Sequence, residues 1–192
     1  TPLLMRMAVA SSLISAEKLM GATTVRGRGK IKLKGYDLLE IEDVYAGPQG
    51  LGLAVLGLTR PFAQLMQNPF QEVQVENVSF QLDVEEEVRA ANIRGIQLKK
   101  SHFEAGDTVD VMVRLKPHLA EEETVEARLV IPDRFQKGRL VLRATNGKSY
   151  RAQEIKRAPG VYTAQDLDGL VRLLGKGVRN DDLVLELVAS TP

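Results

Sequence analysis

Five cationic side chains occupy every second position of one short segment: Arg26, Arg28, Lys30, Lys32 and Lys34. Alternate residues of a β-strand point to the same face, about 6.8 Å apart, so the spacing predicts a strand with one uniformly basic face. A row of this kind matches the charge pattern of a polyanion such as a nucleic acid, an acidic cell-wall polymer or phospholipid headgroups. These five residues, the basic row, are the candidate polyanion-binding or partner-binding surface.

The segment that follows the basic row carries acidic residues that could neutralise it. Glu40 and Glu42 alternate with Leu39 and Ile41, and Asp43 comes next. An antiparallel return strand would set these acids opposite the cations and leave a solvated, partly paired face. Aromatic residues make up only 5% of the chain and none interrupts the basic row, which disfavours nucleic acid as the partner.

A nucleophile beside a base would indicate catalysis, and the chain offers one such pair, Ser101–His102, with Asp107 and Asp110 close by. Adjacent residues of a strand point to opposite faces, so the Ser101 hydroxyl would contact the His102 ring only at a special turn, and we expect a loop beside a strand start. No serine lies in a Gly-x-Ser-x-Gly elbow. We therefore expect no catalytic residue in this chain.

Metal and cofactor sites find little support in the residue types. The chain has no cysteine and only two histidines, His102 and His118. Cysteine-ligated zinc, iron–sulfur clusters and multi-histidine sites are therefore excluded. Gly27 and Gly29 lie inside a strand pattern without a third glycine before a helix, so they do not form a dinucleotide-binding loop. We expect neither a metal nor a cofactor.

The composition is that of a folded chain with no overall electrostatic preference. Of 192 residues, 44% are apolar and 27% charged, and 26 basic against 25 acidic residues give a net charge of +1. The apolar segment Thr1–Met20 is interrupted by Arg6 and closed by Glu17, so it is too short to span a bilayer and predicts an amphipathic helix. Because residue 1 is Thr, we expect a processed product or a piece of a longer protein.

The first half of the chain should position the basic row in an α/β layer. Periodicity predicts strands over Thr23–Gly35 and 39–47, a helix over Leu51–Gln67 that Pro61 kinks or splits, and a long strand over Glu72–Glu86. Apolar residues change parity inside the long strand, which predicts a bulge near Glu76–Asn77. We expect this strand to lie at a sheet edge, where it could pair with a partner strand.

Short alternating segments separated by turn residues fill the second half. We expect strands at Ala90–Leu98, Asp107–Leu115, Thr124–Ile131, Arg139–Thr145 and Lys148–Lys156. Asn146–Gly147 is the strongest hairpin signal and should join the last two. A helix from Ala164 to Lys176, capped by Thr163, and a final strand over Asp181–Ala189 complete the prediction.

Together these elements predict an α+β fold in two domains. Residues 1–87 should form an α/β module of two helices and a mixed or antiparallel sheet. Residues 88–192 should form an immunoglobulin-like β-sandwich with a C-terminal helix and strand. The expected boundary near residues 87–90 follows the acidic run at 85–87.

Several segments share their order and spacing with a known family. They run from Arg26 to Tyr36, Leu39 to Gly47, Asn68 to Phe70, Val73 to Val78, Glu104 to Val109, Leu115 to Pro117, Ile131 to Pro132 and Arg179 to Leu183. In order and spacing they resemble the region after the catalytic core in secreted bacterial proteins of the SpoIVB-type serine peptidase family. The resemblance covers most of the chain.

The resemblance implies an extracytoplasmic protein, secreted or in the cell envelope, whose peptidase-like part precedes Thr1. The family's serine loop and catalytic histidine are not present in this sequence, so the chain should not cleave peptides by itself. We expect a non-catalytic accessory module, without a transmembrane segment, that contacts the rest of the parent chain, another protein or a second copy of itself. One alternative is a polyanion-binding module that uses Arg26–Lys34, and another is a hydrolase with an unusual site.

Overall fold

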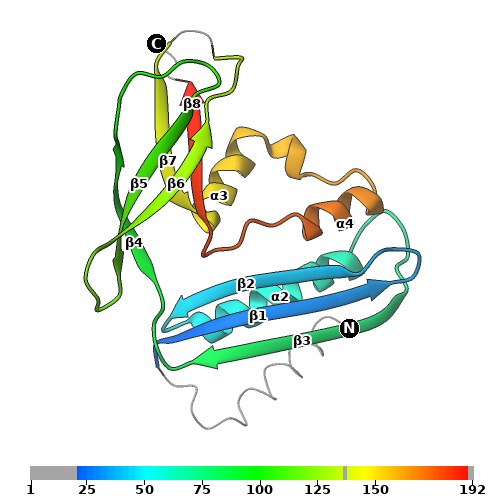
Figure 1. Cartoon of the computed structure of the whole chain (residues 1–192). Helices are drawn as coiled ribbons and strands as arrows, with labels where there is room; N and C mark the ends of the chain where they lie inside the picture. Colours follow the sequence, from blue (N-terminus) through cyan, green and yellow to red (C-terminus); the bar gives the residue numbers. More distant parts are fainter. Residues whose placement is uncertain (1–20, 136–137, 190–192) are drawn as a thin grey trace. The chain divides into compact units, whose positions relative to one another are not determined.

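The computed structural model describes residues 21–135 and 138–189 (Figure 1). The helix predicted over Thr1–Met20 lies outside the described residues. The described chain combines helices with antiparallel sheets, which confirms the predicted α+β class. It divides into two compact units: the first contains residues 21–89 and 151–181, and the second contains residues 90–150 and the chain from Asp182 onward.

The first unit is built on a three-stranded antiparallel sheet. Its strands are β1 (Thr23–Leu33), β2 (Leu39–Gly47) and β3 (Val75–Glu85), in the order β2-β1-β3. Burial alternates along β1, so Val25, Ile31 and Leu33 are buried on one face while the cations point to the other. The predicted two-faced strand and its antiparallel return strand are therefore confirmed.

Helix α2 (Gly50–Met66) covers the apolar face of this sheet over β1 and β2 (Figure 1). Gly27 of β1 permits the close approach, because a Cβ there would lie 3.0 Å from Leu58 Cδ1. A Cβ on Gly29 would lie 3.4 Å from Leu58 Cδ2 and 3.1 Å from the Phe80 ring of β3. The predicted split at Pro61 does not occur, because α2 is one helix. Buried side chains before and after Pro61 hold both halves on the sheet and offset the lost backbone hydrogen bond.

Strand β3 contains the predicted bulge. Lys32 pairs with Asn77 and Leu33 pairs with Val75, so Glu76 is an extra residue without a partner on β1. One extra residue reverses which side chains face the core, and this explains the change of parity in the sequence. Beyond the bulge the pairing with β1 is regular to Glu85, and β3 is an outer strand of the described sheet, as expected.

The segment Arg151–Asp181 folds back onto the first unit. It contains the end of α3 (Gly147–Arg157), the 3-10 turn η1 (Pro159–Tyr162) and α4 (Leu167–Gly175). In α4, Leu167, Leu170 and Leu174 pack on the sheet core that contains Ile31, Leu33 and Leu39. This packing groups α4 with the first unit, whereas the predicted division placed the helix with residues 88–192.

The cap of α4 also differs from the prediction. The Asp166 carboxylate accepts a hydrogen bond from the Gly169 amide at 2.6 Å and caps the helix. Thr163, the predicted cap, instead donates its hydroxyl to the Pro159 carbonyl at 3.0 Å. A carboxylate at this position both accepts the amide and interacts favourably with the helix dipole.

The second unit consists of two sheets in its described residues. Strands β4 (Ala91–Leu98), β5 (Thr108–Pro117) and β6 (Glu123–Val130) form one antiparallel sheet, and β7 (Leu140–Asn146) pairs with β8 (Leu183–Ala189) in the other. Buried Val109, Val111 and Val113 of β5 belong to one core with apolar side chains of β7 and β8. The two sheets therefore pack face to face.

One predicted strand, Lys148–Lys156, is a helix instead. Asn146 ends β7, and its side-chain oxygen accepts a hydrogen bond from the Ser149 amide at 2.8 Å. Asn146 thus starts α3 rather than the hairpin expected at Asn146–Gly147, and β7 pairs with the distant β8. Asn is favoured both at helix starts and in tight turns, so the dipeptide alone does not distinguish the two.

Candidate interaction surface

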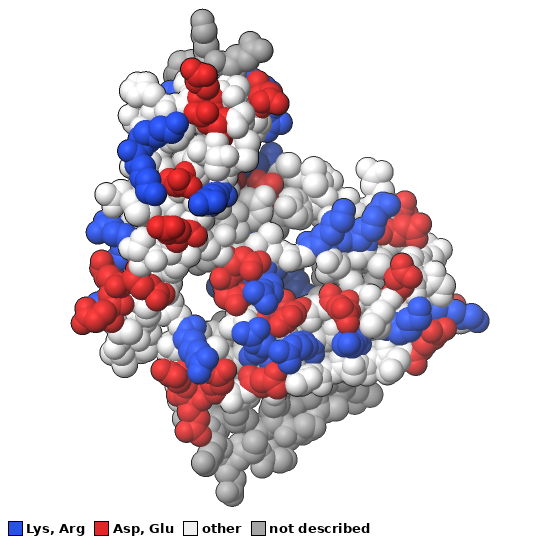
Figure 2. All heavy atoms as spheres, viewed as in Figure 1, with Lys and Arg blue, Asp and Glu red and all other residues white. Residues whose placement is uncertain are grey.

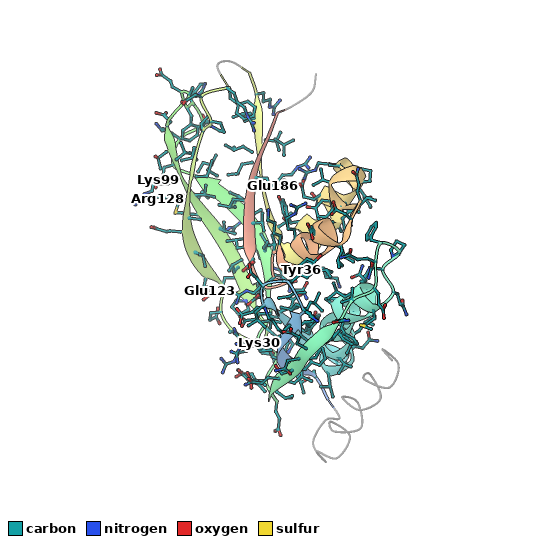
Figure 3. All side chains as sticks on the ribbon, turned by 90° about the vertical axis from the view of Figure 1, so that its right-hand side faces the viewer. Lys30, Tyr36, Lys99, Glu123, Arg128 and Glu186 are labelled. Atoms are coloured by element: carbon teal, nitrogen blue, oxygen red, sulfur yellow. The ribbon has the colours of Figure 1, made fainter. Side chains whose placement is uncertain are left out.

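The basic row lies on and just after β1, the central strand of the first sheet. Arg26, Arg28, Lys30 and Lys32 share the face that α2 leaves uncovered, and Lys34 follows the end of the strand. Figure 3 shows Lys30 on this strand. Because β1 has neighbours on both sides, each cation faces side chains of β2 and β3 as well as solvent.

Carboxylates of both neighbouring strands pair with three of these cations. The nitrogen–oxygen pairs are Arg26–Glu42 (3.2 Å), Arg28–Asp83 (2.9 Å) and Lys30–Glu40 (3.0 Å). The predicted pairing with Glu40 and Glu42 is confirmed. All these side chains are about half exposed, so each pair adds little stability, but together they neutralise three of the five cations. Figure 2 accordingly shows basic and acidic atoms interleaved over this face rather than one basic field.

The last two cations of the row are engaged differently. Lys32 donates its ammonium to the Tyr36 carbonyl. Lys34 lines a shallow hollow of about 270 Å³ together with Tyr36 and Gln71. The Tyr36 hydroxyl donates to Asp168 Oδ1 at 2.8 Å, and this hydrogen bond raises the pKa of Tyr36 above its ordinary value. The row therefore does not act as one continuous positive surface.

Asp43, the third acid expected to face the row, is instead buried on the opposite face of β2, where only 6% of the residue is exposed. Its Oδ1 accepts hydrogen bonds from the amides of Val44 (2.9 Å) and Asn180 (2.7 Å). Its Oδ2 accepts from Arg151 Nη2 and from the Tyr45 hydroxyl, both at 3.3 Å. We call these contacts the Asp43 network.

The Asp43 network fastens the segment 151–181 to β2. Arg151 also donates to the Asn180 side-chain oxygen at 2.7 Å, and the Asn180 side-chain amide donates to the Val44 carbonyl at 3.2 Å. Burial, followed by the nearby Asp43 carboxylate, raises the pKa of Tyr45 to about 12. A buried carboxylate that accepts four hydrogen bonds is satisfied, which is the property of a structural anchor rather than of a proton-transfer group.

Ser101 Oγ lies 3.1 Å from His102 Nδ1, a contact that the sequence allowed only at a turn. Both residues lie in the loop between β4 and β5, so the alternation of a strand does not apply to them. Asp107 accepts hydrogen bonds from Lys100 and from the Glu104 amide. Among the described contacts no carboxylate joins His102, so the pair lacks the third group that orients a catalytic base.

The second unit carries a shallow hollow of about 380 Å³ on the outer face of β5 and β6. Lys99, Asp110, Glu126 and Arg128 line it, and Figure 3 shows Lys99 and Arg128 near each other. Arg128 Nε contacts Asp110 Oδ1 at 3.0 Å. The lining mixes both signs of charge, so it does not select one class of ion.

Within residues 21–135 and 138–189, no three His, Asp or Glu side chains gather as a metal site. No helix there is long and apolar enough to cross a membrane.

The outer face of α2 exposes apolar side chains. The exposed fractions are 38% for Leu53 and 49% for Leu56. The helix carries no charged residue from Gly50 to Thr59. A helix that is apolar on all sides is usually buried on all sides. The sequence of α2 therefore already indicates that its outer face contacts something.

The two outer strands of the first sheet differ in how their edges are used. On β2, Asn180 bonds the Val44 carbonyl, and Arg179 Nη1 lies 3.9 Å from Glu42 Oε1. On β3, no strand of the described residues pairs with the edge opposite β1. The sequence predicted an edge for β3, but it did not predict the cover over β2, because Asn180 is 136 residues away from Val44.

Comparisons with known proteins leave the family open. No protein-family model, no curated protein and no solved structure matches this chain. The similarity to the SpoIVB-type peptidase family therefore stays a prediction that rests on the order and spacing of the segments named above.

Proposed function

We propose that this chain is a non-catalytic accessory module of a secreted SpoIVB-type peptidase-like bacterial protein, and that it docks on the rest of the parent chain. The observation that carries the proposal is the outer face of α2, where Leu53 and Leu56 stay exposed and Arg60 is the one charged residue of the helix. Exposed apolar side chains gathered on one element are typical of an interface. In this proposal the second unit is an immunoglobulin-like module of the same protein.

The docking test uses the gene region upstream of the Thr1 codon. If it encodes a peptidase-like domain, that domain is expressed separately and titrated with this chain by calorimetry. Leu53→Asp with Leu56→Asp should abolish binding, because two carboxylates would be buried at the contact. Leu119→Asp is the matched control, since Leu119 is 93% exposed in the second unit. An upstream region without such a domain, or unchanged binding by the double variant, would overturn the proposal.

The absence of catalysis is tested with the Ser101–His102 contact. The full chain should leave fluorogenic peptides and esters unchanged, because no described group orients His102. Hydrolysis that disappears in Ser101→Ala would instead establish a hydrolase. Hydrolysis that persists in Ser101→Ala would come from a contaminant or from another site.

Polyanion binding is the second function that the basic row suggests, and the ion pairs weigh against it. Three of the five cations contact carboxylates, so few charges are available for release of counterions from a polyanion. Retention of the wild type on heparin at low salt, lost in Arg26→Glu/Lys30→Glu/Lys34→Glu, would establish this function. No retention at low salt would exclude it.

A further inference from the structure

We propose that β3 is a self-association strand: two copies of this chain pair antiparallel through their free β3 edges, with the two-fold axis at Gln81. Pairing in this way would give a continuous sheet in the order β2-β1-β3-β3-β1-β2. The outer face of α2 takes no part in it, so self-association and docking on a parent chain succeed or fail separately.

Within residues 21–135 and 138–189, no strand pairs with the outer edge of β3, so its hydrogen-bonding groups are open to a partner strand. Every second residue of an outer strand directs its N–H and C=O away from the sheet. Natural proteins block such edges with lysine, proline or inward-pointing charges. The segment Asn77–Glu85 contains no lysine, arginine or proline, and its Val, Phe and Leu residues favour strand pairing.

The two ends of the free edge determine the register. The bulge at Glu76 interrupts regular geometry on one side. On the other side Thr24 holds the chain after β3, because its hydroxyl donates to the Glu87 carbonyl at 2.6 Å and accepts from the Arg89 amide at 2.7 Å. Regular strand therefore runs from Asn77 to Glu85, and full overlap of two such segments centres on Gln81.

The side chains are self-complementary in this register. The opposing pairs would be Asn77–Glu85, Ser79–Asp83 and Gln81–Gln81 on the polar face, and Val78–Val84 and Phe80–Leu82 on the apolar face. No acid opposes an acid, and apolar residues meet apolar residues. Moving the axis to Asp83 would set two carboxylates directly opposite each other, which is unfavourable. Charge therefore selects the same register as the geometry.

The apolar face of β3 is incompletely covered within one copy. Helix α2 packs over β1 and β2 and reaches β3 only at its margin. Val84 is 36% exposed, and Val78, Phe80 and Leu82 are partly exposed. A second β3 would place an apolar neighbour beside each of these side chains, which adds to the backbone hydrogen bonds of the edge.

Single cysteines test the register directly, because the chain has no cysteine of its own. In the full chain, Gln81→Cys should give a covalent dimer under mild oxidation, since directly opposed Cβ atoms lie about 5 Å apart. Ser79→Cys is the matched control on the same exposed face. Residue 79 opposes Asp83 of the second copy. The two cysteines at position 79 would therefore lie about 13 Å apart along the strand, too far for a disulfide.

Wild-type chain should show a concentration-dependent dimer by light scattering, and Gln81→Cys should yield at least about tenfold more covalent dimer than Ser79→Cys. A wild-type monomer up to about 0.5 mM would overturn the proposal. A dimer in which both cysteine variants crosslink equally, or neither does, would place the interface elsewhere.

Discussion

The two outer strands of the first sheet both pair with β1, but the contacts on their outer sides differ. Strand β2 is held by the Asp43 network, and its Val44 carbonyl is bonded by Asn180. Strand β3 carries Asp83, whose carboxylate pairs with Arg28 of β1, yet its other edge meets no described strand. The difference is that residues far along the chain contact the outer side of β2, whereas no strand of the described residues pairs with the outer edge of β3.

The largest expected effect comes from removing the Asp43 network, which holds β2. Asp43→Ala should lower the free energy of unfolding by about 3 kcal/mol, because Arg151 and two amides lose a buried acceptor. Urea denaturation followed by circular dichroism measures it. Glu42→Ala, next in the chain but exposed, should cost no more than about 0.5 kcal/mol. Equal effects of the two variants would show that the Asp43 network does not anchor the segment 151–181.

The second effect comes from placing a charge on the outer edge of β3. Gln81→Lys places two ammonium groups opposite each other at the two-fold axis, so self-association should weaken about tenfold. Sedimentation over a range of concentrations measures the dissociation constant. Gln97→Lys makes the same change on an exposed position of β4 in the second unit and should have no effect. A tenfold loss in both variants would point to general charge repulsion rather than to β3.

The third effect is a pH dependence of the free energy of unfolding that comes from Tyr45 in the Asp43 network. The pKa of Tyr45 is raised to about 12, so between pH 10 and 12 the folded chain keeps a proton that the unfolded chain releases. Stability from this group is present below pH 10 and is lost as the pH rises through about 12. Because Tyr45 is partly exposed, we expect a loss of about 1 kcal/mol.

Urea denaturation on both sides of this pH window measures the effect. Tyr45→Phe should remove that part of the decline, whereas Tyr162→Phe, at an exposed tyrosine, should retain it. A decline of the same size in Tyr45→Phe would show that Tyr45 does not carry the pH dependence.

The smallest effect on stability concerns the carboxylates of the uncovered face. Glu42→Gln should change unfolding by no more than about 0.5 kcal/mol. It should nevertheless raise the salt concentration needed to elute the chain from heparin, because Arg26 and Arg28 lose a carboxylate partner. Glu126→Gln in the second unit is the charge-matched control. Equal elution of the two variants would mean that pairing is not what restrains the basic row.

Local patterns predicted the parts of this fold that depend on neighbours in sequence. Alternation gave the two faces of β1 and the pairing with Glu40 and Glu42, and the parity change located the bulge at Glu76. The burial of Asp43 could not be predicted in this way, because Arg151 and Asn180 are 108 and 137 residues distant. Asn146 was misassigned because one residue type serves both helix starts and turns.

Amide hydrogen exchange of the full chain, resolved by residue, tests the contrast between β2 and β3 most directly. In dilute solution, the Val44 amide of β2, which donates to Asp43, should exchange slowly, while alternate amides between Asn77 and Glu85 should exchange quickly. Raising the concentration should protect those β3 amides and leave β2 unchanged. Protection of β3 that is complete in dilute solution and independent of concentration would contradict an open, self-pairing edge.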